Sequence, residues 1–302
     1  MNTPTTEDLG PKQNNGLKLA LTLALTTFAF APILVRISGE VDAIALATVR
    51  TVSAVTILAP LWYFFRVKYV VSFYSSKDNF YAALAGLCLG LHFILWISSL
   101  SYTSVASASV LVTCHPVILI LFEATVFKRI FIRRVWFGVF TAFTGSALLG
   151  YTDSSAVTDY QDPLLGNAMA LSAALLFAGY FLISQRLRQK SDWLNYIFRV
   201  YGFSAIACVA ISIFLDVNFE MSKEAWLVGI GLAIGPQIIG HGTMNFAVRS
   251  ISPTFLSTLI LAEPIGASLL ALTLFAEMPP PLSLLALAVI MTGIILTWKT
   301  KM

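Results

Sequence analysis

The sequence predicts an all-α integral membrane protein, with ten transmembrane helices arranged as two inverted five-helix repeats. The 302 residues are 58% hydrophobic and only 11% charged, whereas a soluble domain carries roughly 25% charged residues. The apolar residues form continuous runs of membrane-spanning length, and the second half repeats the pattern of the first at an offset of about 150 residues. An odd number of spans in each repeat forces the second copy into the membrane upside down.

Ten segments have the length of about 20 apolar residues that a helix needs to cross the hydrocarbon core. Their continuous apolar character favours helices over the alternating strands of a barrel. In the first half the predicted spans are 17–37, 43–65, 80–100, 104–127 and 132–151. In the second half they are 164–184, 193–215, 225–248, 253–275 and 282–298.

The repeat also predicts how the chain is divided. We expect a first five-helix repeat over 17–151 and a second over 164–298, joined by an extracytoplasmic linker at 152–163. Residues 1–16 are polar and are expected to form a disordered cytoplasmic tail, and residues 299–302 a second, short one. Residues of one type recur at matching positions of the two repeats, namely Arg36 and Arg186, Asp42 and Asp192, Arg50 and Arg199, His92 and His241, Pro116 and Pro264, and Gly145 and Gly293.

The distribution of positive charge predicts the orientation in the membrane. Of the 19 Lys and Arg residues, 15 fall on one side of the predicted spans, Arg36 and Lys223 fall on the other, and Arg50 and Arg199 lie within spans. The side richer in Lys and Arg faces the cytoplasm. Both termini are therefore predicted to be cytoplasmic, in the inner (cytoplasmic) cell membrane of a bacterial-type cell.

Two stretches carry a resemblance to a known family. In the first half LHFILWISSL at 91–100 is followed by YTSVASA at 102–108, and in the second half Gly240-His241 precedes AEPIGA at 262–267. Their order, spacing and duplication resemble the EamA-type branch of the drug/metabolite transporter superfamily, over residues 17–298. The resemblance implies an EamA-like ten-span carrier that exports or exchanges small metabolites, often amino acids and related solutes.

The chain departs from the family's pattern at the end of one span. The family often ends its fourth and ninth spans with Gly-Glu, but here the ninth ends with Ala276-Glu277 and the fourth with Lys128-Arg129. Because the acidic residue is missing from the first copy, we expect Glu277 to be a feature of the helix end rather than a transport site.

Three charged residues lie deep within the predicted spans, where a charge costs on the order of 2.5–3.5 kcal/mol. Arg50 and Arg199 occupy equivalent places in the second and seventh spans. They are candidates to line a central cavity and neutralise an anionic substrate group, or alternatively to snorkel or to clamp a neighbouring helix. Glu263 in the ninth span is a candidate proton-coupling site, and the alternative is a fixed salt bridge to one of the arginines.

Two polar stripes are expected to point into the protein, because a polar stripe that faces lipid is costly. His92 and Trp96 lie one turn apart in the third span, and Gln237, His241 and Asn245 share a face of the eighth. We expect these side chains to line a solute cavity from opposite sides. The alternative is hydrogen bonding between helices that holds the bundle together.

Two prolines are expected to kink the helices at matching points of the repeats. Pro116 lies in the fourth span and Pro264 in the ninth. Proline removes a backbone hydrogen bond and interrupts a helix, and broken helices at corresponding places point to a central site. We expect both prolines, with Glu263, to act in coupling or gating.

Together these features predict a transporter, either an exporter or a permease, of small polar metabolites such as amino acids, working by alternating access between the repeats. An exchanger of organic anions or sugar-conjugated metabolites is the alternative, and a membrane-embedded enzyme or structural membrane protein is a remoter one. The sequence has no HExxH or GxSxG motif, and we expect no enzyme activity, no cofactor and no metal. The expected partners are a small-molecule substrate, the lipid bilayer and protons as a coupling ion, and no nucleic acid.

Overall fold

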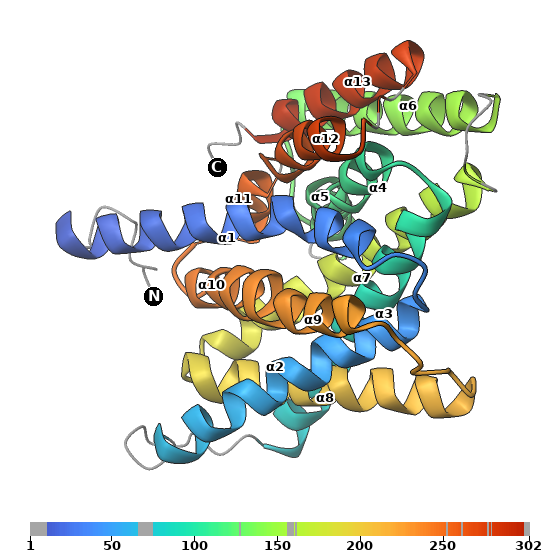
Figure 1. Cartoon of the computed structure of the whole chain (residues 1–302). Helices are drawn as coiled ribbons and strands as arrows, with labels where there is room; N and C mark the ends of the chain where they lie inside the picture. Colours follow the sequence, from blue (N-terminus) through green and yellow to red (C-terminus); the bar gives the residue numbers. More distant parts are fainter. Residues whose placement is uncertain are drawn as a thin grey trace.

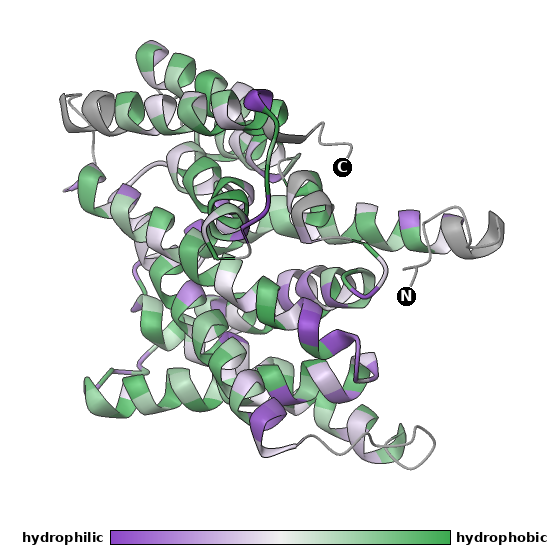
Figure 2. Cartoon of the chain, turned by 180° about the vertical axis from the view of Figure 1, so that it is seen from behind, coloured by the Kyte–Doolittle hydropathy of each residue, from purple (hydrophilic) through white to green (hydrophobic). Residues whose placement is uncertain are grey.

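The computed structural model describes residues 11–65, 75–126, 128–155, 160, 162–251, 253–260, 262–276, 278 and 280–298. These residues form helices joined by loops, with no β-strand among them (Figure 1). Seven of the described helical segments are long and apolar enough to cross a membrane, and α12(Ala262–Phe275) and α13(Pro281–Trp298) contain shorter apolar segments. Hydrophobic residues predominate along the helices, and the most hydrophilic residues gather toward helix ends and loops (Figure 2). The prediction of an all-helical, multi-pass membrane protein is confirmed.

Each predicted span of the first half is helical. The first three spans are the unbroken helices α1(Pro11–Ile37), α2(Ala43–Phe65) and α3(Ser76–Tyr102). The fourth is divided into α4(Val105–Val112) and α5(His115–Thr125), and the fifth is α6(Arg133–Ser155).

The second half has the same order of spans, and its third span additionally contains a π-helix. Its first two spans are α7(Pro163–Arg188) and α8(Trp193–Phe214). The third comprises α9(Lys223–Leu232), the π-helix η2(Ala233–His241) and α10(Gly242–Ala247), and the fourth is divided into α11(Pro253–Leu259) and α12. The last span is α13. The predicted helix-end residue Glu277 lies outside the described residues.

The matching aspartates of the two repeats start equivalent helices. The Ile44 N–H donates to Asp42 Oδ1 at 2.7 Å at the beginning of α2, and the Asn195 N–H donates to Asp192 Oδ1 at 2.8 Å at the beginning of α8. A cap of this kind satisfies a backbone donor that has no partner within the helix and stabilises it by about 0.5–2 kcal/mol. The Asp pair in the sequence is therefore a pair of helix caps.

In the packing of the two repeats, the third span of each repeat contacts the first two spans of the other. α3 packs against α7 and α8, and the third span of the second repeat, formed by α9 and η2, packs against α1 and α2. The last spans of the repeats, α6 and α13, lie side by side (Figure 1). This exchange is the pattern that a two-fold relation between two inverted repeats produces.

The fourth span of each repeat is followed by a residue with a left-handed backbone. Lys128 and Ala276 both have φ of 54°, and they lie at matching points of the repeats. For residues other than glycine this conformation costs about 1–2 kcal/mol. The resemblance described above implies a glycine at these two positions, where this chain has Lys128 and Ala276.

Replacing Ala276 by glycine should therefore stabilise the protein, by up to about 1 kcal/mol once the greater flexibility of glycine in the unfolded chain is included. The matched control is Gly39→Ala. Gly39 has φ of 72° and no atom within 4 Å of an added Cβ, so only the backbone is affected and the variant should lose stability. Thermal unfolding in detergent measures both changes. A lower midpoint for Ala276→Gly would show that the turn does not limit stability.

Candidate functional site

Three interrupted helices meet near the middle of the bundle. Residues 113–114 leave the helix between α4 and α5, and Pro116 stands in the first turn of α5, where proline's missing N–H is tolerated. The chain also leaves the helix between α11 and α12, and Pro264 lies in the first turn of α12. The π-helix η2 contains Pro236, and π-helical turns occur frequently at functional sites.

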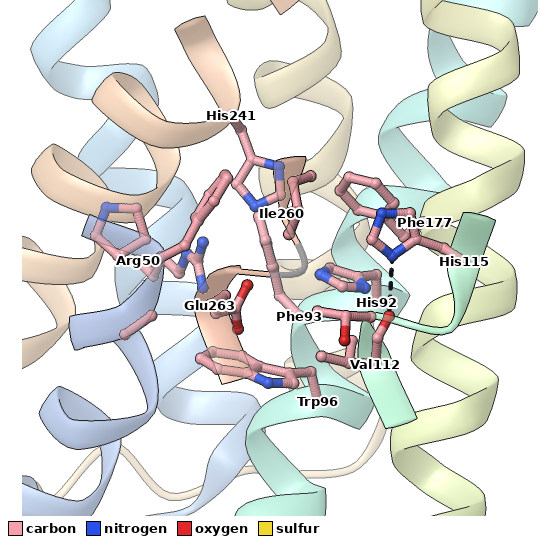
Figure 3. Close-up of a pocket in the computed structure, with 14 residues that line it drawn as sticks. Arg50, His92, Phe93, Trp96, Val112, His115, Phe177, His241, Ile260 and Glu263 are labelled. Carbon is pink, nitrogen blue, oxygen red and sulfur yellow. Dashed lines mark hydrogen bonds between the residues drawn. The ribbon is translucent and has the colours of Figure 1, made fainter. Parts of the chain in front are cut away.

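These segments line a cavity with about 40 Å³ of space for the centres of water-sized molecules (Figure 3). Both repeats contribute to its walls, through α1 to α5 from the first and through α7, η2 and the interrupted span of α11 and α12 from the second. The lining residues are Phe28, Ala31, Arg50, His92, Phe93, Trp96, Val112, Thr113, His115, Phe177, Pro236, His241, Ile260 and Glu263. Five predicted site residues are among them, namely Arg50, His92, Trp96, His241 and Glu263.

A guanidinium and a carboxyl group face each other across one part of the cavity. Arg50 is 1% exposed, its Nε donates to Gln237 Oε1 at 3.2 Å, and its Cζ lies 3.6 Å from the ring centre of Phe93. The carboxyl group of Glu263, a residue 8% exposed, lies beside the guanidinium (Figure 3). Among the described residues, the ion pairs do not include one between Arg50 and Glu263. Both groups thus keep hydrogen-bonding capacity for a ligand.

Two histidines are held in a fixed tautomer at the other side. His115 Nδ1 lies 3.1 Å from the carbonyl oxygen of Val112 (Figure 3), and His92 Nδ1 lies 2.9 Å from that of Ala173. A carbonyl oxygen can only accept, so each Nδ1 carries the hydrogen. The Nε2 atom of each neutral ring is then a hydrogen-bond acceptor.

Three polar atoms of the lining are buried without a partner among the described residues. They are Trp96 Nε1, His115 Nε2 and His241 Nδ1. A buried polar atom without a hydrogen bond costs about 1–3 kcal/mol, and native proteins keep few of them unless they serve a purpose or meet a bound molecule. Their position on one cavity indicates a place where a polar ligand completes the hydrogen bonds.

Aromatic rings form most of the remaining wall. The ring of Phe177 lies 5.4, 4.5 and 5.7 Å from those of His92, His115 and His241, respectively. Phe28 packs edge-on against His241 at 5.0 Å. The cavity therefore surrounds its few polar groups with apolar surface, which is the usual composition of a small-molecule site.

A second hollow is lined in part by Val35, one helical turn after the cavity residue Ala31 in α1, and by Ile97, which directly follows the cavity residue Trp96 in α3. Arg36 borders it at the end of α1 and donates from Nη2 to the carbonyl oxygen of Thr103 at 2.9 Å and to the hydroxyl of Tyr160 at 2.6 Å. The hollow lies beside the α1–α2 loop, and Arg36 joins α1 to the end of α3 at its edge.

Three predicted binding residues lie outside the lining. Arg199 donates to Asn79 Oδ1 at 2.7 Å and to Asn195 Oδ1 at 3.2 Å, and it links α8 to α3. Gln237 accepts a hydrogen bond from Arg50. Asn245 donates to the hydroxyl of Tyr180 and to the carbonyl oxygen of His241. Of the second stripe, only His241 reaches the cavity.

Sequence reasoning missed several residues of the wall. Phe28, Phe93 and Phe177 lie in apolar spans, where a phenylalanine is indistinguishable from ordinary core. His115 was identifiable only by its place before Pro116 in the kinked span. Among the described residues no group of three or more His, Cys, Asp or Glu side chains is arranged to hold a metal ion.

Comparison with known proteins gives consistent results. The model of the EamA-like transporter family matches the chain twice, over residues 15–151 and 164–299. The uncharacterized transporter YwfM of Bacillus subtilis is 29% identical over 215 residues, which cover 70% of this chain and 71% of that protein. An uncharacterized transporter of Archaeoglobus fulgidus is 21% identical over 204 residues, covering 68% and 71%. A solved crystal structure covers 93% of this chain with a TM-score of 0.66 at 18% identity, and supports the fold alone.

Proposed function

Since the chain belongs to the EamA-like transporter family, we propose that it carries small zwitterionic metabolites, such as amino acids, across the cell membrane by alternating access. The cavity between the repeats is the observation that supports this. It places a cationic and an acidic side chain, Arg50 and Glu263, beside three unpartnered polar atoms within an aromatic wall. A carboxylate suits the guanidinium, and an ammonium group suits the carboxylate and the imidazole acceptors.

The proposed mechanism uses the interrupted fourth spans. α4 with α5, and α11 with α12, each supply part of the cavity wall and lie at matching points of the two repeats. Carriers built from inverted repeats expose one site to each side in turn by rocking one part against the other. In the proposed orientation, with both termini in the cytoplasm, the hollow beside Arg36 is the outer route.

Glu263 is the proposed site of coupling to protons. It is the one acidic residue among those that line the cavity. Its carboxylate can take up either a proton or the ammonium group of the substrate, and competition between the two would couple them. Export is the proposed direction, by analogy with the family.

The test is counterflow in liposomes that contain the purified protein. Each amino acid that exchanges is compared with its analogues that lack one charged group. For leucine these are 4-methylpentanoate and 3-methylbutylamine. The proposal expects leucine to exchange and both analogues to fail, because each leaves a charged side chain without its partner. Equal transport of 4-methylpentanoate and larger organic acids would instead favour an anion exchanger.

Replacing Trp96 by phenylalanine should weaken binding of the transported amino acid by roughly three- to tenfold, because it removes the Nε1–H donor and keeps an aromatic ring. Ligand-dependent thermal stabilisation of the purified variant gives the change in affinity. Trp226→Phe is the matched control, since Trp226 is half-exposed at the beginning of α9 and should leave affinity unchanged. Unaltered affinity in both Trp96→Phe and His241→Ala would place the substrate elsewhere.

A further inference from the structure

The loop between α5 and α6 concentrates positive charge on its surface. Residues 128–134 read KRIFIRR, and all except the partly buried Phe131 are exposed, Ile130 by 99%. Arg129 is neutralised by Glu123, whose Oε2 lies 2.8 Å from its Nη1. The other three basic side chains have no ion pair or side-chain hydrogen bond among the described residues. These are Lys128, Arg133 and Arg134.

The beginning of α6 adds to this charge. Arg133 and Arg134 are the first two residues of the helix, and its first turn contains no acidic residue. A helix N-terminus carries a partial positive charge, so the arginines increase the potential there. Lys190 by contrast pairs with Asp78 at 3.3 Å. The loop therefore presents three uncompensated cations that suit the oxygens of a phosphate group.

A groove lies between α5, α6 and α7, farther along α6 from its arginines. It has about 280 Å³ of space for the centres of water-sized molecules. Phe143 and Leu175 line it and are 47% and 59% exposed, so it opens at the surface of the bundle that faces lipid. The remaining lining residues are Cys114, Val117, Ile118, Ala142, Ser146, Leu171 and Ser172.

The groove lies at the depth of an acyl chain whose headgroup is at the loop. Phe143 is ten residues beyond Arg133 in α6, which corresponds to about 15 Å along a helix. Half the hydrocarbon thickness of a bilayer is also about 15 Å. Charge and depth together favour an anionic phospholipid over a soluble anion.

We infer that an anionic phospholipid binds this surface, with its phosphate between Lys128, Arg133 and Arg134 and one acyl chain along α6 in the groove. Such a lipid reaches the interruption of the fourth span, because Cys114 lines the groove and both of its neighbours in sequence line the central cavity. The lipid thereby contacts the segment that positions His115.

Native mass spectrometry of the purified full chain tests the inference, with phosphatidylglycerol or phosphatidylcholine of the same acyl chains added after delipidation. Wild type should retain one phosphatidylglycerol and no phosphatidylcholine. K128Q/R133Q/R134Q should bind phosphatidylglycerol about a hundredfold more weakly, since each basic residue near a membrane surface contributes several-fold. The control K77Q/R186Q/K190Q removes the same number of charges elsewhere and should bind like wild type.

A second variant tests the acyl chain separately. Ser172 is exposed in the groove, so Ser172→Phe fills the space without disturbing the core and should weaken retention of the lipid several-fold. The inference is overturned if the loop variant retains phosphatidylglycerol like wild type, if the control loses it equally, or if phosphatidylcholine binds as well. Unchanged retention by Ser172→Phe, or displacement by millimolar inorganic phosphate, would reduce the surface to an anion site and overturn the lipid assignment. Unshifted thermal midpoints verify that the variants fold.

Discussion

Arg50→Gln is expected to lower transport of a carboxylate-bearing solute by roughly 10- to 100-fold. The guanidinium lines the cavity and is held by Gln237 and by the face of Phe93, which leaves its terminal nitrogens to meet a substrate. A hydrogen bond to a charged group contributes about 1.5–3 kcal/mol, which corresponds to this range of affinity. Glutamine keeps a polar side chain but carries no charge, so the carboxylate loses its counter-ion.

The effect of Arg50→Gln on stability should be small. Removing the guanidinium relieves its desolvation cost, and the neighbouring Glu263 can take up a proton once this cation is gone, so that no buried charge is left without a partner. Counterflow in liposomes and thermal unfolding in detergent, measured on the same preparations, separate the two effects. A variant that unfolds, or that transports normally once its amount is corrected, would make Arg50 a clamp between helices rather than a binding residue.

Arg199→Gln provides the matched comparison. Arg199 joins α8 to α3 through Asn79 and Asn195 and does not line the cavity. Its replacement should lower the thermal midpoint and leave transport per folded molecule unchanged. If both variants lost anion transport equally and remained folded, the exchanger of organic anions would be the better description of the protein.

The sequence alone paired these two arginines, and helix geometry explains why they separate. Each follows an aspartate that caps its helix, but Arg50 is eight residues after Asp42 and Arg199 is seven after Asp192. One residue turns a side chain by about 100° around the helix axis. The two guanidinium groups therefore leave α2 and α8 on different faces. The alignment of the two repeats tolerates a shift of one residue, so it pairs the two arginines without showing that they point in different directions.

The polar stripe of the eighth span shows a second limit of prediction. On an α-helix Gln237, His241 and Asn245 share a face, but residues 233–241 form a π-helix, whose wider turns change that alignment. Pro236 was the only residue in the sequence to indicate an irregular backbone there. The helical character of the spans and the interruptions of the two fourth spans depend on hydrophobic length and proline, so both could be predicted from the sequence.

The close contact between the last spans of the two repeats gives the largest expected effect on stability. A Cβ on Gly293 of α13 would lie 2.4 Å from the backbone nitrogen of Ala142 and 2.7 Å from the carbonyl oxygen of Gly138 in α6. A Cβ on the matching Gly145 of α6 would lie 2.8 Å from the backbone nitrogen of Ile290 in α13. Small residues let membrane helices approach to backbone contact, and each repeat supplies one such glycine to the same interface.

Gly293→Ala should therefore destabilise the protein by about 2–3 kcal/mol, at the upper end of what overpacking costs. The clashing atoms belong to the backbone, so no side chain can move aside and α6 must shift away from α13. Gly202→Ala is the control, because no atom lies within 4 Å of its added Cβ and alanine favours a helix over glycine by about 1 kcal/mol. Thermal unfolding in detergent should show a lower midpoint for Gly293→Ala and for Gly145→Ala, and an equal or higher one for Gly202→Ala. Equal midpoints in all three would mean that the ends of the two repeats do not meet in backbone contact, and the exchanged packing of the repeats would then not extend to α6 and α13.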